Sequence, residues 1–113
     1  MQQEEAGRDM AGDGAMEPDR ARTMAEVRAA IDAIDRDIVA LLGRRMRWIE
    51  AAGRIKPERG AVRDQWRKDD VHAKVLAEAQ KHDFPPALLR ELYEVLMEGS
   101  IAHEFETFDK RGY

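Results

Sequence analysis

Charged side chains that interrupt the apolar pattern of a long helical segment are the first candidates for chemistry in this sequence. Arg45 stands where an apolar residue would continue the stripe, and Lys56 follows 11 residues later. On one helix these two cations point in directions only about 20° apart and lie about 16 Å apart. Arg28 lies roughly 25 Å before Arg45, so the two cannot share a small pocket on one helix. Arg28 could instead reach a pocket built around the helix of a partner chain in an antiparallel dimer.

Polar side chains also end an apolar row near the C-terminus. Leu92, Leu96, Ser100 and Glu104 follow one another at steps of four residues, so this helical row turns polar at its last two members. Two or three cations and an acid on inward faces would suit a small dianionic ligand. The alternative is structural, with arginine stems that lie along an apolar surface and a glutamate paired to a nearby base. The residues alone leave both interpretations open.

The elements that must position these groups are helices. Apolar residues recur at steps of three and four from residue 24 to residue 55, which predicts one long N-terminal helix. Thr23 and Glu26 have the spacing of a capping box at its start. Pro57 and Gly60 break the pattern after it.

Two further helices are predicted in the second half of the chain. Asp64 is a reasonable N-cap for a helix that runs to about Lys81. Pro85 and Pro86 suit the first turn of a third helix that continues to about Phe108. No segment alternates as a half-buried strand would. The sequence therefore predicts an all-α fold with three helices per chain.

The length of the first helix predicts an oligomer. Its 32 residues extend about 48 Å, whereas a compact globule of about 91 residues has a diameter of roughly 30 Å. The apolar stripe runs along the whole helix, so another surface must cover it. Because symmetric dimers are the commonest oligomers, we expect a homodimer.

The net charge is unevenly distributed along the chain. The 113 residues include 19 Lys and Arg and 23 Asp and Glu, which gives a formal charge of −4. Residues 1–22 hold six acids and three bases, and we expect a disordered acidic tail there. A helical domain over residues 23–109 and a short C-terminal tail over 110–113 complete the predicted organisation. The nearly neutral body argues weakly against a nucleic-acid partner.

Several classes of function are excluded or disfavoured. Without cysteine there is no disulfide, Cys-ligated zinc, iron–sulfur cluster or thiol nucleophile. His72, His82 and His103 lack the spacing of metal ligands, so we expect no metal site. The longest apolar run is far too short to cross a membrane, and the acidic N-terminus does not look like a secretory signal. We therefore expect a cytoplasmic protein.

Several segments of the sequence resemble the all-α AroQ-type chorismate mutase family. They read VRAAIDAID over residues 27–35, IVALLGRRM over 38–46, GRIK over 53–56, VRD over 62–64 and SIAHE over 100–104. The resemblance extends over about residues 24–108. The first two segments and the short loop from Lys56 to Val62 are also similar to the isochorismate pyruvate-lyase branch of this family.

The resemblance implies an intertwined helical homodimer whose sites bind a small dicarboxylate. Arg45, together with Arg28 of the partner chain, would bind the substrate carboxylates. Lys56 would donate to the ether oxygen of the enolpyruvyl group. Glu104 stands at a position that often holds glutamine and would donate to the same oxygen, which requires a protonated carboxyl group.

The resemblance also assigns residues around the rest of the substrate. Arg67 would be a further carboxylate or loop contact, Ser100 would lie near a carboxylate, and Asp64 would lie near the ring hydroxyl. The sequence departs from the family pattern at Lys68, where many mutases place a glutamate that contacts this hydroxyl.

The implied reaction is the pericyclic conversion of chorismate to prephenate in aromatic amino-acid biosynthesis. It needs no nucleophile, metal or cofactor, because the enzyme holds a compact conformer and stabilises charge on the ether oxygen. The first alternative is an isochorismate pyruvate-lyase that gives salicylate and pyruvate. A mutase of amino-substituted chorismate is another. The last is a catalytically silent helical dimer that binds a small acid or a partner protein.

Overall fold

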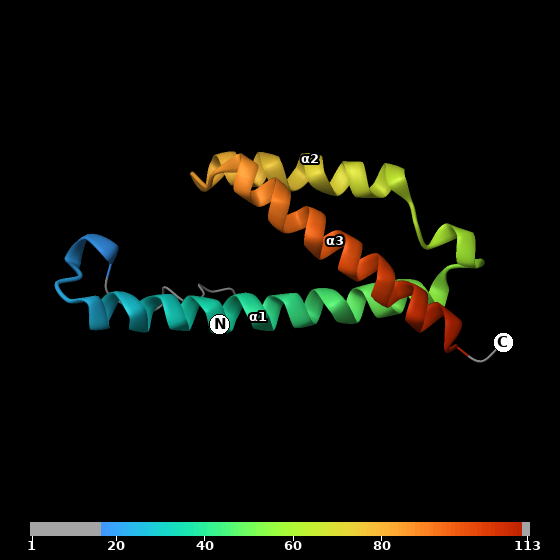
Figure 1. Ribbon diagram of the computed structural model, residues 1–113, viewed down its shortest axis with the longest axis horizontal. Coiled ribbons are helices and arrows are strands. Elements are labelled where there is room, and N and C mark those ends of the chain that lie inside the picture. Colours follow the sequence, from blue (N-terminus) through green and yellow to red (C-terminus); the bar gives the residue numbers. More distant parts are fainter. Residues whose placement is uncertain (1–16, 112–113) are drawn as a thin grey trace, which may run out of the picture. The chain divides into compact units, whose positions relative to one another are not determined.

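The described part of the chain, residues 17–111 of a computed structural model, is helical and contains no strand. Its α-helices are α1 (Met24–Ile55), α2 (Gln65–Lys81) and α3 (Pro86–Asp109), with two short 3₁₀ helices, η1 (Pro18–Arg20) and η2 (Arg59–Ala61) (Figure 1). The predicted all-α fold with three helices is thus confirmed. The chain divides into two compact units, the first ending at Arg45 and the second beginning at Met46.

The predicted capping groups set the starts of α1 and α2. The Glu26 amide donates to Thr23 Oγ1 at 3.1 Å, and the Thr23 amide donates to Glu26 Oε1 at 3.0 Å. Backbone donors from Arg22 and Thr23 hold the pKa of the Glu26 carboxyl below its ordinary value. At α2, Asp64 Oδ1 accepts from the Arg67 amide at 3.1 Å. Both helices therefore begin where a side chain satisfies backbone donors that the first turn leaves unpaired.

A tight turn reverses the chain between α2 and α3, which pack against each other. The turn contains Asp83 in the left-handed region, with φ of 57°, a conformation that aspartate tolerates better than most residues. The Phe84 amide donates to the Ala79 carbonyl at 2.9 Å and closes the turn. Pro86 then occupies the first turn of α3, where its missing N–H costs no helical hydrogen bond.

Gly53 allows the C-terminal end of α1 to lie directly against α3 within the second unit. A Cβ atom at this buried position would lie 3.0 Å from the Glu104 carbonyl oxygen and 3.1 Å from Thr107 Cβ. His103 of α3 contacts Glu50 of α1 at 2.7 Å in the same region. The two helices are therefore fixed close together at the end of α1.

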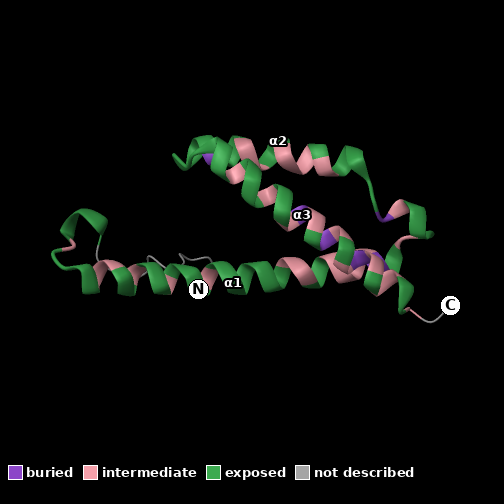
Figure 2. Ribbon diagram, in the orientation of Figure 1, coloured by how far each residue is buried: buried purple, intermediate pink, exposed green. Residues whose placement is uncertain are grey.

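Large apolar side chains remain exposed in both units (Figure 2). None of residues 17–45 is buried, and the exposed large apolar residues of α1 here range from 39% (Leu42) to 66% (Val39) exposed. In the second unit Trp48 is 75% exposed and Trp66 is 74% exposed. Among residues 17–111, the buried apolar side chains are Val62, Ala79 and Met97.

The predicted tails lie largely outside the described residues. Residues 1–16 and 112–113 fall outside them, and η1 occupies the last part of the predicted N-terminal tail. After α3 ends at Asp109, Arg111 forms hydrogen bonds with the end of α1. In the part of the chain that the structure describes, no helix combines the length and the apolar character needed to cross a membrane.

Candidate active site

A buried ion pair joins Lys56 and Glu104, two of the predicted site residues. Lys56 Nζ lies 2.7 Å from Glu104 Oε2 and also donates to the Val62 carbonyl at 3.3 Å. Glu104 is only 4% exposed, whereas the Lys56 side chain is 27% exposed. The ammonium group is thus held at a fixed place and keeps access to the exterior.

The backbone around this pair explains why it forms. Lys56 directly follows the last residue of α1, and its amide still donates to the Ala52 carbonyl at 3.0 Å. Glu104 lies on α3 at the place where Gly53 permits close approach of the two helices. Pro57 lies just after the end of α1 and cannot continue the helix. The chain then enters η2, and the Val62 carbonyl after it accepts from the Lys56 ammonium.

Ser100 lies one turn before Glu104 on α3 and is also buried, at 3% exposed. Its hydroxyl donates to the Leu96 carbonyl at 2.7 Å, a local bond of the kind that serine often makes inside helices. The predicted change from apolar to polar residues along this face of α3 is therefore present, with Ser100 and Glu104 on the inward side.

Asp64 and Arg67 are engaged at the start of α2. Asp64 caps the helix, and Arg67 Nη1 forms an ion pair with Asp70 Oδ2 at 2.8 Å. Both residues are exposed. Their polar groups are therefore engaged within the first turns of α2.

Arg28 and Arg45 belong to the first unit, on α1. Arg28 is exposed and Arg45 is half-buried. Lys56 and Glu104, by contrast, contact each other within the second unit. The role of either arginine in the same site therefore stays a prediction.

Lys68 forms part of an ion-pair network that the sequence reasoning missed. Its ammonium lies 2.6 Å from Glu98 and 2.9 Å from Glu94 of α3, and these carboxylates raise the pKa of Lys68. Arg63 also binds Glu98 at 2.6 Å, and His72 contacts Glu94 at 3.2 Å. Arg63 and Lys68 together lower the pKa of Glu98 to about 2. The cation that departs from the family pattern thus links α2 to α3.

One signal in the sequence pointed to this network. Glu94 and Glu98 are four residues apart on the predicted third helix, so their carboxylates share one face. Two acids on one face favour a cationic partner, but the register between α2 and α3 decides which cation they meet.

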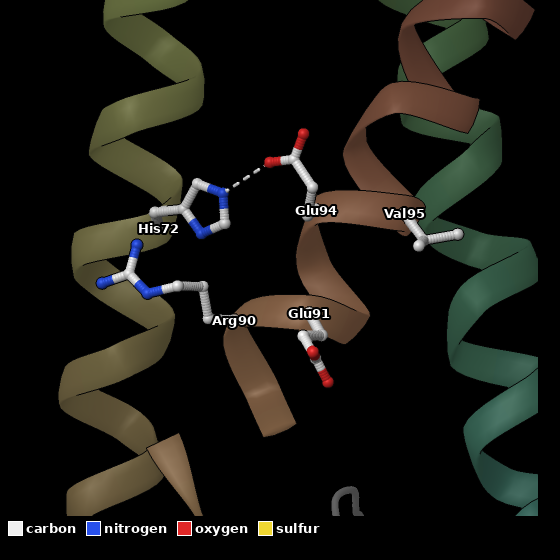
Figure 3. A pocket seen from close by; sticks show the side chains of 5 residues that line it. All are labelled: His72, Arg90, Glu91, Glu94 and Val95. Atoms are coloured by element: carbon white, nitrogen blue, oxygen red, sulfur yellow. Dashed lines mark hydrogen bonds and ion pairs between the residues drawn. The ribbon is translucent and has the colours of Figure 1, made fainter. Parts of the chain in front are cut away.

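A hollow of about 550 Å³ lies beside the same network (Figure 3). It is lined by His72 of α2 and by Arg90, Glu91, Glu94 and Val95 of α3. Figure 3 shows the His72 ring turned toward the Glu94 carboxylate. Neither Lys56 nor Glu104 lines this hollow, so it is separate from the buried pair.

Comparison with known proteins identifies the family of this chain. The model of the family chorismate mutase type II matches residues 27–105, a segment that includes every predicted site residue from Arg28 to Glu104. The chain belongs to this family. The chorismate mutase type II match thus extends into all three helices and includes both partners of the buried ion pair.

The chain is also similar to isochorismate pyruvate lyase of Pseudomonas aeruginosa. The two are 47% identical over 45 residues, which are 40% of this chain and 45% of that protein. The chain thus matches less than half the length of this curated relative. Family membership and this partial similarity agree in pointing to enzymes of the chorismate mutase type II family.

We expect the Glu98→Gln variant to lose less stability in acid than the wild type. The Glu98 carboxyl group has a pKa of about 2, whereas its ordinary value is 4.5. Its ion pairs therefore contribute their full stability at pH values above this ordinary pKa. That stability is lost as the pH falls from about 5 toward about 2. Urea unfolding across this range measures the difference.

The exposed Glu91 on the same helix provides the control. Glu91→Gln should keep the steep acid dependence of the wild type. Equal losses in the wild type and Glu98→Gln would contradict a stabilising role for the network.

Proposed function

We propose that this chain is a chorismate mutase that converts chorismate to prephenate. The observation that carries the proposal is the buried pair of Lys56 and Glu104, which lies within the segment that matches the family. It supplies a positioned ammonium group beside a carboxyl group. A pericyclic reaction needs no nucleophile, metal or cofactor, so donors and cations that bind the substrate suffice.

In the proposed mechanism the site acts by restricting conformation and by stabilising charge. Arg45 and Arg28 of the partner bind the two carboxylates and hold the substrate in its compact conformer. The Lys56 ammonium then donates to the ether oxygen, where negative charge develops as the carbon–oxygen bond breaks. Asp64, Arg67 and Ser100 would line the rest of the substrate.

Glu104 is the second donor in this proposal. It lies 2.7 Å from Lys56 Nζ, so the two groups meet at one place. In its protonated form the carboxyl group can donate to the ether oxygen. The acid then acts together with Lys56 on the same atom.

We further propose that the functional form is an intertwined homodimer. The exposed apolar side chains of α1 in the first unit form a stripe too long for a single small domain to cover. A second copy of α1 offers a matching apolar surface, because symmetric association pairs identical faces. Arg28 of one chain would complete the site of its partner in this arrangement.

A second candidate function is isochorismate pyruvate-lyase activity. The partial similarity to the enzyme from Pseudomonas aeruginosa favours it. Both reactions are pericyclic and act on dicarboxylates that differ in the position of the ring hydroxyl, so the same cations would serve either. A helical dimer that binds a small acid or a protein without catalysis is the remaining alternative.

Incubation of the purified protein with chorismate and with isochorismate, separately, tests the assignment. We expect prephenate from chorismate; salicylate and pyruvate from isochorismate alone would favour the lyase, and no turnover would leave the binding role. Arg45→Ala and Lys56→Gln should each lower kcat/KM about 100-fold or more, as loss of a positioned donor does. The Lys56→Gln amide can still donate to Glu104 and Val62, which protects the fold.

Arg44 provides a matched control for Arg45, because it is the neighbouring arginine on α1 and is exposed. Arg44→Ala should keep most of the activity. Full activity in Arg45→Ala or Lys56→Gln would mean that the proposed site is wrong.

We expect Glu104→Gln to retain or raise mutase activity at pH 8 and to flatten its pH profile. The amide group donates a hydrogen bond at every pH, whereas the carboxyl group donates only when protonated. Steady-state rates between pH 5 and pH 9 measure the effect. A Glu104→Gln enzyme that is folded but inactive at every pH would refute the donor role.

Mixing two inactive variants tests whether Arg28 acts across the dimer. Arg28→Ala and Lys56→Gln damage different residues of each site, so a heterodimer of the two would contain one intact site. After subunit exchange, the mixture should recover about a quarter of the wild-type activity, since half of the dimers are mixed. A monomer by light scattering, or no recovery despite exchange, would contradict the shared site.

A further inference from the structure

We propose that Arg111 is a positioning residue that clamps the C-terminal end of α1 and thereby holds Lys56 in place. Its Nη1 donates to the carbonyls of Lys56 at 2.6 Å, Gly53 at 3.2 Å and Arg54 at 3.3 Å. One guanidinium nitrogen thus contacts the last turn of α1 from the residues that follow α3. The catalytic consequence rests on the proposed function, whereas the clamp itself does not.

Pro57 explains why the end of α1 needs a donor from elsewhere. In a continuous helix the Gly53 carbonyl would accept from the amide of residue 57, but proline has no N–H. The last carbonyls of a helix lack partners, and a cation near them is favourable. Arg111 therefore replaces the donor that Pro57 removes and adds a positive charge at the negative end of the helix.

Arg111 is itself held by α3. Its guanidinium lies 3.7 Å from the centre of the Phe108 ring, and its amide donates to the Phe108 carbonyl at 3.3 Å. The residue is half-buried, so its charged group is partly shielded from water. The clamp thus ties the backbone of Lys56 to the same helix that carries Glu104.

The geometry connects the clamp to the buried ion pair. Lys56 is the first residue after α1. Its amide still donates a hydrogen bond to the Ala52 carbonyl, as in the helix. The 2.6 Å bond from Arg111 fixes the carbonyl of the same residue. With both backbone polar groups of Lys56 bound, its side chain starts from a fixed point and reaches Glu104 at 2.7 Å.

Arg59 offers a matched comparison within the same part of the second unit. Its guanidinium lies over the ring of Phe105 at 4.5 Å and binds Asp109 of α3 at 3.0 Å. It therefore shares with Arg111 a cation–aromatic contact and a tie to the end of α3, but its ion pair joins η2 to α3. The Arg59→Ala variant therefore loses a comparable contact with α3, while the carbonyls at the end of α1 keep Arg111 as their donor.

The test compares Arg111→Ala, Arg111→Lys and Arg59→Ala in the full chain. With whichever substrate the wild type converts, Arg111→Ala should lower kcat about tenfold to a hundredfold with a smaller change in KM, since small misplacements of a reacting group have this cost. Arg111→Lys should recover part of the loss, because an ammonium still donates to these carbonyls. Arg59→Ala should keep nearly the wild-type kcat.

Amide hydrogen exchange over residues 54–56 provides a measurement that does not depend on activity. We expect about tenfold faster exchange there in Arg111→Ala, as loss of one hydrogen bond to a charged group implies, and no such change in Arg59→Ala. Unchanged exchange in Arg111→Ala, or equal loss of kcat in both alanine variants, would overturn the clamp. If the wild type converts neither substrate, the proposed function fails and the exchange result alone decides on Arg111.

Discussion

The buried carboxylate of Glu104 is the constraint around which the second unit is organised. A buried charge costs several kcal/mol unless an opposite charge and hydrogen bonds accompany it, so the end of α1 must deliver Lys56 to α3. Gly53 meets this requirement by leaving room for the backbone of α3. The loop through Val62 meets it by supplying a carbonyl to the ammonium. Two helices that pack through apolar side chains alone would need neither the glycine nor this carbonyl.

The rest of the second unit relies on polar links more than on a large core. Val62, Ala79 and Met97 are the buried apolar residues in the described part of the chain. The link from Lys68 of α2 to two glutamates of α3 adds ion pairs between two helices that pack against each other. Isolated surface ion pairs contribute little to stability, but several charges in a network with fixed geometry contribute more. Charge pairing therefore takes over part of the role that a core has in a larger domain.

The sequence predicted the local structure well and the contacts between helices poorly. Apolar periodicity and the capping residues Thr23 and Asp64 are local signals, and the observed helices begin where these signals place them. The expectation that Lys56 and Glu104 serve one site came from the family resemblance, because the two residues are far apart in the chain, and their direct ion pair was not predicted. The Lys68 network depends on the register between two helices, which no single segment encodes. Arg111 lies after the end of α3, where no periodic pattern marks it.

The exposed indoles have a consequence for how this protein can be observed. Trp48 and Trp66 are the only tryptophans of the chain, and both are about three-quarters exposed in the single chain. Indole emission depends on contact with water, so the ultraviolet fluorescence of this chain reports what covers its outer surfaces. It is nearly blind to the small core around Val62. An optical signal that in many proteins follows folding would here follow any contact that covers these two indoles.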